Sequence, residues 1–452
     1  MARSDDRPDR HLHHTLDSDH TLPFNDLDHT GIARTLAQIA ERPGDLADLY
    51  LERREETAFD RFGLRVVREE GVAVRLVRGA DVWLTAIDRL DADAFGEAWR
   101  RTARAMPRAT YPVRPFEIAK WQRPEHDEIF AWSGRLQRAL RSRRIRTPPQ
   151  VSLRRHRAWT RVIGTRLSGG TEHEHFYSID VELPDARWGG LVTKLDHNAA
   201  DDVALQLSRA TQAHGADPPS PTRACVLGPQ VVAVLLHEAV AHALEVDILA
   251  YGGHPEAAVG VRLGTDEIDV LDDPSSAPES VRRQADDEGL PVRRRWLLRG
   301  GVVEQPLCDS RWAAKSDVLV AGAGRRSGRH RAPAPRSSHL ELRPGEHTTD
   351  ALLAATEGGL YLTAASRGRL DPLSGHFILE LPYGRRITNG MPAEPVGPSV
   401  LRGHVSDLLR AVTAVGAETA VAGAGWCAKD GMRLPVWATV SPMRLEGVEI
   451  GS

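Results

Sequence analysis

Apolar positions in the first half of the chain follow two different periods. Ile32, Leu36 and Ile39 recur at i, i+4 and i+7, which predicts a short amphipathic helix. Short runs rich in β-forming residues predict antiparallel strands at 48–54, 64–68, 71–77, 81–87, 151–162 and 176–183. Helical spacing returns at 92–106, 127–146 and 201–213. This half of the chain therefore predicts an α+β domain with antiparallel strands.

The second half is organised around one strongly apolar segment. Residues 214–221 are rich in proline and predict a linker. Beyond it, 231–249 is apolar on nearly every face, which predicts a buried helix. Short strand-like runs with Gly and Pro turns surround this helix, including an Asn389-Gly390 hairpin signal. The fold class predicted for the whole chain is α+β in two domains, an N-terminal α+β domain over 30–213 and a C-terminal β-rich domain over 222–452.

Composition and charge exclude several classes of protein. The 452 residues include 59 Lys plus Arg and 62 Asp plus Glu, a net charge of −3 that argues against a dedicated nucleic-acid binder. No apolar run approaches the roughly 20 residues that a membrane-spanning helix needs. The three cysteines form no CxxC pair, which disfavours a disulfide framework. Residues 1–29 lack the apolar core of a signal peptide and predict a disordered, His-rich tail, so we expect a cytoplasmic protein.

An HExxxH pattern lies inside the predicted buried helix. His237 and His242 are five residues apart, which places them about 140° apart around a regular helix. A one-residue π-bulge would bring both imidazoles to one face, and such bulges are frequent at functional sites. We therefore predict a distorted helix that binds zinc, with Glu238 as the general base. Two imidazoles and a carboxylate among apolar residues would otherwise be desolvated at considerable cost.

A catalytic zinc ion needs a third protein ligand. The candidates in the same half of the chain are Glu245, Asp247, His254 and the cysteines. Cys427 stands out because it lies in a glycine-rich stretch where a thiolate could approach a metal closely. The residues alone leave open whether Cys427 is a ligand or an ordinary buried cysteine.

Several segments carry a family resemblance, and it extends from about residue 47 to the C-terminus. They are 237–247, 286–289, 324–326, 333–336 and 425–436. In this order they resemble the TldD branch of the TldD/PmbA metalloproteases. The resemblance implies that His237, His242 and Cys427 bind Zn²⁺ and that Glu238 is the catalytic base. It also implies pairing with a PmbA-type (TldE) subunit that lacks the metal motif, and cleavage of unstructured peptides, including the leader peptides of ribosomal natural products.

Some positions depart from the family pattern. The family has glycine where this chain has Ala241, Ala243 and Val246, so the bulge must here be tolerated without the flexibility of glycine. His339 replaces an asparagine of the family in the segment after Arg336. We therefore expect the metal chemistry to be retained and the substrate contacts to differ.

The predicted function is that of a zinc metallopeptidase acting on unstructured peptides or peptide-like intermediates, as half of a heterodimer with a PmbA/TldE-like subunit or as a homodimer. Arg325, Arg326, Arg336 and His339 are expected to contact the substrate. One alternative is a tailoring amidase that trims a small natural-product intermediate. An alternative from another class is a nucleic-acid-associated regulator that uses the arginine-rich stretch 135–157.

Overall fold

The computed structural model describes most of the chain. The described residues are 24, 27–40, 42, 44–79, 81–103, 121, 127–165, 168–253, 255–315 and 321–451. Nearly all of the predicted His-rich tail lies outside the described residues. The α+β class and the two-domain organisation are confirmed.

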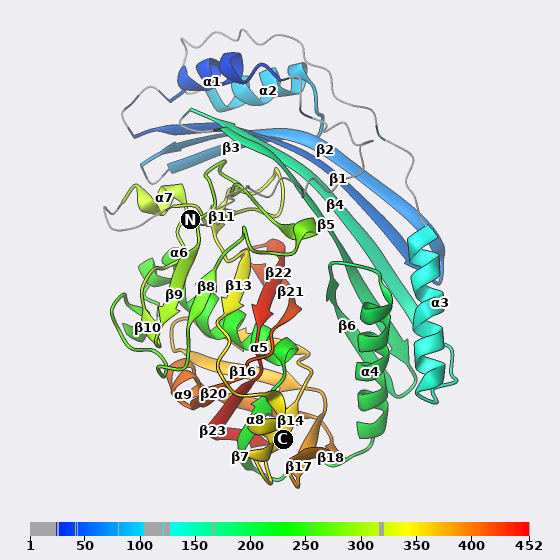
Figure 1. The fold of residues 1–452 in the computed structure, drawn as a ribbon. Coiled ribbons are helices and arrows are strands. Elements are labelled where there is room, and N and C mark those ends of the chain that lie inside the picture. The colour runs from blue at the N-terminus through cyan, green and yellow to red at the C-terminus, as the bar shows by residue number, and fades with distance from the viewer. Residues whose placement is uncertain are drawn as a thin grey trace, which may run out of the picture.

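The N-terminal half forms an antiparallel sheet of order β3-β2-β1-β4-β5-β6. Its strands are β1 (Leu46–Asp60), β2 (Gly63–Arg78), β3 (Asp81–Ile87), β4 (Gln150–Gly164), β5 (Ser168–Leu183) and β6 (Ala186–Val192). Its helices are α1 (His29–Ala37), α2 (Ala92–Thr102), α3 (Asp127–Ser142) and α4 (His197–Ala213). Figure 1 shows the long strands as a curved sheet that arches over the second half of the chain. Helices α1 and α2 cover the outer face of this sheet at one end, and α3 covers it at the other.

The predicted break between strands at 64–68 and 71–77 is wrong, because β2 is continuous through this region. Glu69 and Glu70 pair across the sheet with Arg54 and Arg53 of β1. The Arg53 Nε atom lies 3.1 Å from the Glu70 carboxylate. Opposite charges on facing positions stabilise an antiparallel pair. The two glutamates are therefore accommodated within the strand.

The C-terminal half contains two larger sheets that share one core. One has the order β10-β9-β8-β13-β22-β21, and the other β15-β16-β19-β23-β7-β14-β17-β18 with β20 paired to β23. The strands are β7 (Thr222–Leu227), β8 (Val270–Asp272), β9 (Arg295–Arg299), β10 (Val302–Val303), β13 (His339–Leu342), β14 (Leu360–Leu362), β15 (Arg367–Leu370), β16 (His376–Leu381), β17 (Gly384–Thr388), β18 (Met391–Val396), β19 (Ser399–His404), β20 (Val412–Val415), β21 (Ala420–Lys429), β22 (Met432–Val440) and β23 (Met443–Gly451), together with the short pair β11 (Gly324–Arg325) and β12 (Ala334–Pro335). Residues 214–221 connect α4 to β7, and the domain boundary placed there stays a prediction.

The apolar segment predicted to be a buried helix lies in the core between these sheets. Helix α5 (Pro229–Leu236) is buried from Val231 onward against strands of both sheets. The helix does not run on regularly to residue 249, because the backbone at Glu245 is extended, with φ −74° and ψ 124°. The chain resumes as α6 (Val246–Ala250), and the remaining short helices are α7 (Ser310–Ala313), α8 (Thr349–Ala354) and α9 (Val405–Arg410).

Glu245 interrupts the helix because the backbone around it pairs with another segment. The amide N–H of Val246 donates to the Leu307 carbonyl, and the amide N–H of Leu307 donates to the Leu244 carbonyl. These bonds satisfy backbone groups that the broken helix leaves free. The break directs the chain away immediately after the HExxxH motif.

Candidate metal centre

The helix that carries the HExxxH motif changes its winding at the motif itself. Residues His237–Ala241 form a π-helical turn, in which the amide N–H of His242 donates to the carbonyl of His237. The extra residue in this turn rotates His242 back toward His237, so the two ring centroids are 4.4 Å apart. The predicted π-bulge is confirmed. Alanine at position 241 adopts an ordinary right-handed backbone, so the bulge forms without a glycine there.

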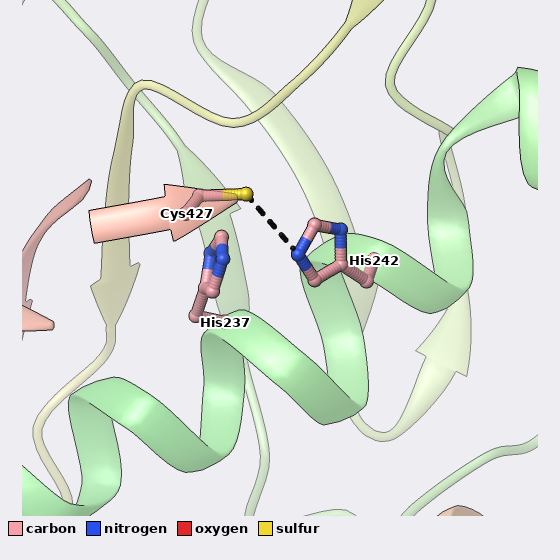
Figure 2. Close-up of side chains that lie close together, drawn as sticks. All are labelled: His237, His242 and Cys427. Atoms are coloured by element: carbon pink, nitrogen blue, oxygen red, sulfur yellow. Dashed lines mark hydrogen bonds between the residues drawn. The ribbon is translucent and has the colours of Figure 1, made fainter. Parts of the chain in front are cut away.

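A cysteine from the other end of the domain completes the cluster. Cys427 lies on β21, and its Sγ atom is 3.3 Å from Nε2 of His242. One nitrogen from each histidine and this sulfur all lie within 4.8 Å of one another. Figure 2 shows the sulfur pointing toward the two imidazoles from the strand that faces the helix. Within the part of the chain that the structure describes, this is the one group of His, Cys, Asp or Glu residues compact enough to hold a metal ion.

The chemistry of these side chains fits a metal ion. Both ring nitrogens of His237 are buried and have no hydrogen-bond partner among the residues that the structure describes, although buried polar atoms are nearly always paired. Burial also holds the pKa of His237 well below its usual value, so the ring is neutral, the form that binds a metal. Two imidazole nitrogens and one thiolate are a ligand set that zinc prefers.

The second histidine is held by a buried carboxylate. Nδ1 of His242 lies 3.0 Å from Oε2 of Glu245, which is fully buried. Although burial alone would raise the pKa of Glu245, the neighbouring His242, Arg336 and Lys429 lower it to about 2. Burial likewise disfavours the charged His242 ring, but Glu245 outweighs it and the pKa of His242 stands well above its usual value. An ionised carboxylate at Nδ1 fixes the ring and directs Nε2 toward Cys427.

Glu238 lies in the same cavity as the three candidate ligands, a space of about 730 Å³. Burial raises the pKa of its carboxyl group. Among the described residues no hydrogen-bond partner is found for this carboxylate, so it is available to a bound molecule. Strand β15 closes one side of the cavity, and its Gly368 packs directly on Glu238.

The N-terminal sheet also contributes to the cavity wall. Gly189 and Gly190 of β6 line it together with Trp426 of β21. Gly423 allows β6 and β21 to come together, since a Cβ atom there would lie 2.7 Å from the carbonyl oxygen of Leu191. This contribution leaves no signal in the amino-acid pattern, because a pair of glycines carries no chemistry of its own.

The other predicted site residues lie in different surroundings. Arg336 is buried and bonds to Asp247 (3.3 Å) and Asp430 (3.1 Å) in the carboxylate network behind His242. Arg325 and Arg326 line a second cavity of about 340 Å³ between the N-terminal sheet and the C-terminal domain. His339 is fully buried on β13, and its Nε2 lies 3.0 Å from the Thr439 hydroxyl.

These four residues do not line the metal cavity, and their contact with a substrate stays a prediction. Of the alternative third ligands, Glu245 and Asp247 act behind His242 instead, and His254 lies outside the described residues.

A largely buried His-His-Cys cluster beside a carboxylate that has no partner among the described residues is typical of a metal-dependent protein. The model of the PmbA/TldA metallopeptidase C-terminal domain matches residues 222–452, about half of the chain, and the chain belongs to this family.

Curated relatives are named as metalloproteases. A metalloprotease TldD homolog of Buchnera aphidicola is 27% identical over 290 residues, which cover 63% of this chain and 58% of that protein. A metalloprotease of Methanothermobacter thermautotrophicus is 30% identical over 235 residues, 52% of this chain and 51% of that protein. A zinc metalloprotease TldD homolog of Saccharolobus solfataricus is 23% identical over 248 residues, 55% of each chain. The matches thus span about half the length of these relatives.

Two solved structures share the fold over nearly their whole length. TldE from Thermococcus kodakarensis superposes with a TM-score of 0.69 at 16% identity, covering 90% of this chain and 96% of that chain. A putative modulator of a DNA gyrase from Thermotoga maritima gives a TM-score of 0.71 at 15% identity, covering 93% and 99%. At such identities these similarities show the fold alone. No described helix has the length and apolar character needed to cross a membrane.

Proposed function

We propose that this chain is the zinc-binding, TldD-type subunit of a cytoplasmic metallopeptidase that hydrolyses peptide bonds in unstructured peptides. His237, His242 and Cys427 hold the metal, and Glu238 is the catalytic base. The observation that carries the proposal is the π-helical turn, which brings the two histidines together beside Cys427 and leaves Glu238 unpaired in the same cavity. The relatives named as metalloproteases support the same conclusion.

The roles of the residues follow from their surroundings. Zinc, when bound, supplies a Lewis acid that polarises the carbonyl group of the scissile bond. Glu238 accepts a proton from the attacking water and passes it to the leaving amine, and its raised pKa makes it a stronger base for the first of these transfers. Glu245 keeps the His242 ring oriented through Nδ1.

The walls of the cavity suit an extended peptide. Strands β15 and β21 are the last strands of their sheets, and both border the cavity. The free edge of a strand offers backbone groups that pair with an extended chain whatever its side chains are. A folded domain cannot present its backbone in this way. We therefore expect unstructured peptides to be cleaved and folded domains to be spared.

The second subunit of the enzyme is also a proposal. We infer a heterodimer with a PmbA/TldE-like subunit from the family resemblance, with a homodimer as the alternative. The test is to measure the mass of the purified chain in solution, alone and with a co-expressed TldE-like chain, and to assay both forms. A monomer that hydrolyses a flexible peptide and a folded domain equally well would contradict the proposed assembly and substrate class.

The two alternative functions have less support. The amidase was motivated by the segment around His339, which is buried and does not line the metal cavity. The nucleic-acid alternative relied on 135–157, where Arg155 is buried against Glu55 and Glu128. Arg135 in the same stretch donates to the backbone carbonyl of Leu195. Part of this basic stretch therefore serves the fold itself.

Metal analysis of the purified chain is the primary test of the proposed function. About one zinc per chain is expected, together with hydrolysis of a flexible fluorogenic peptide that stops when a chelator is added and returns with zinc. A chain without bound metal that still cleaves the peptide would refute the proposal.

A further inference from the structure

The strand that carries Cys427 is held by the sheet on one side only. β21 is the last strand in its sheet, and among the described strands it pairs only with β22. The pairing register shifts between Gly423 and Gly425, so the ladder is irregular just before the segment that carries Cys427. Backbone pairing therefore does not by itself fix the distance between Cys427 and the helix. A second connection is needed to hold the sulfur near His242.

Lys429 provides such a connection. It follows Cys427 by two residues on β21, so both side chains leave the same face of the strand. Its Nζ atom lies 2.6 Å from Oε2 of Glu245 and 3.2 Å from both carboxylate oxygens of Asp247. Its side chain is only 17% exposed, and that of Glu245 is fully buried. We call these contacts the Lys429 bridge.

The Lys429 bridge ends on the residue that orients His242. Oε2 of Glu245 is shared by Lys429 and by Nδ1 of His242, so one carboxylate oxygen joins strand and helix. Arg336 reinforces the same network through Glu245 (3.4 Å) and Asp247 (3.3 Å).

From this geometry we propose that Lys429 is a positioning residue of the metal centre. Through Glu245 and Asp247 it holds β21 against the bulged helix, and it thereby keeps the Cys427 sulfur within reach of a metal bound by His237 and His242. The inference rests on the proposed function, because it requires that these three residues bind a metal. The interaction of Lys429 with the metal is indirect.

A purely electrostatic role for Lys429 would have the opposite consequence. A cation close to the cluster repels a divalent metal, so removing the lysine charge would tighten metal binding. A positioning role predicts that the same change weakens binding, because the thiolate leaves its place. The direction of the change in affinity therefore separates the two roles.

The test uses the full chain and two neutral variants, Lys429→Met and Lys429→Gln. Zinc affinity is measured by competition with a chelator. In a second measurement Co²⁺ replaces zinc, and the thiolate-to-cobalt charge-transfer band reports ligation by Cys427. Loss of a residue that supports a metal ligand typically costs about 10–100-fold in metal affinity. We expect a fall of this size in Lys429→Met, with a weaker thiolate band per bound cobalt. Lys429→Gln serves the same purpose should Lys429→Met not fold.

Two further variants sharpen the result. Lys429→Arg is expected to restore most of the affinity and the band, because a guanidinium can bridge two carboxylates. Lys315→Met, the same change at an exposed lysine that lies over the Trp312 ring, is expected to leave both measurements unchanged. A parental thiolate band with equal or tighter zinc binding in the neutral variants would overturn the proposed role of Lys429. A parental chain that shows no thiolate band would instead refute the proposed metal site.

Discussion

A methyl group added at Gly368 tests whether the position of Glu238 is essential for catalysis. A Cβ atom at this position would lie 2.7 Å from Cγ of Glu238 and 2.8 Å from Cγ1 of Val234. Ordinary contact between carbon atoms is about 3.5–4.0 Å, so both contacts must be relieved by shifts of roughly 1 Å. Val234 and Glu238 both line the cavity, but the longer glutamate side chain has more freedom to rotate away than the branched Val234 on helix α5.

The expected cost follows from that displacement. A misplacement of about 1 Å at a reacting group can lower the rate by about 100-fold, which corresponds to about 2.7 kcal/mol of transition-state stabilisation. Gly368→Ala should therefore retain its zinc and lose about two orders of magnitude in kcat/KM on a flexible fluorogenic peptide. Gly403→Ala is the matched control on β19, because its Cβ would meet Leu408 at an ordinary 3.6 Å. Parental activity in a zinc-loaded Gly368→Ala variant would show that the reasoning about Glu238 is wrong.

Three further substitutions test the third metal ligand, the catalytic base and the contribution of a buried histidine to stability. Cys427→Ser should sharply reduce zinc content, since a hydroxyl is a poorer zinc ligand than a thiolate, and unchanged zinc would remove Cys427 from the site. Glu238→Gln should keep the metal and lose turnover, because the amide cannot accept a proton, and hydrolysis at the parental rate would reject the assigned base. Burial, with nearby arginines, lowers the pKa of His156 to about 3, so the folded chain binds fewer protons than the unfolded chain between pH 3 and 6.5. Its contribution to stability is complete above pH 6.5 and falls as the pH decreases, by about 2 kcal/mol at pH 5. His156→Phe should consequently lose less thermal stability between pH 7 and pH 5 than the parental chain does, and an identical pH dependence of Tm would contradict this.

The sequence was sufficient to predict the helix distortion, because a spacing of five residues is incompatible with a shared metal on a regular helix. The partners of that helix were harder to predict. Lys429 and Glu245 are 184 residues apart in the chain, and nothing local to either residue indicates their contact. Cys427 was identified among the alternatives by family resemblance rather than by its own surroundings. Gly368 carries no side chain, so its close approach to Glu238 depends wholly on tertiary structure.

Long-range pairing also explains the differences in secondary structure. The charged pair Glu69 and Glu70 looks like a loop in isolation, but the arginines of β1 opposite them make it part of a strand. The apolar residues up to position 249 look like one helix, but the segment around Leu307 pairs with the backbone next to Glu245 and ends it. In both cases the deciding partner is distant in sequence.

The two halves of the chain contribute differently to the site: one supplies the candidate metal ligands, and the other helps to shape the cavity. The three candidate ligands and Glu238 all come from the second half, the part that the family model covers. The shape of the cavity also requires β6 of the N-terminal sheet, which lies against β21 close to the strand residues that precede Cys427. Metal ligation and substrate fit can thus vary independently, since changes in the N-terminal sheet alter the cavity wall without touching a ligand.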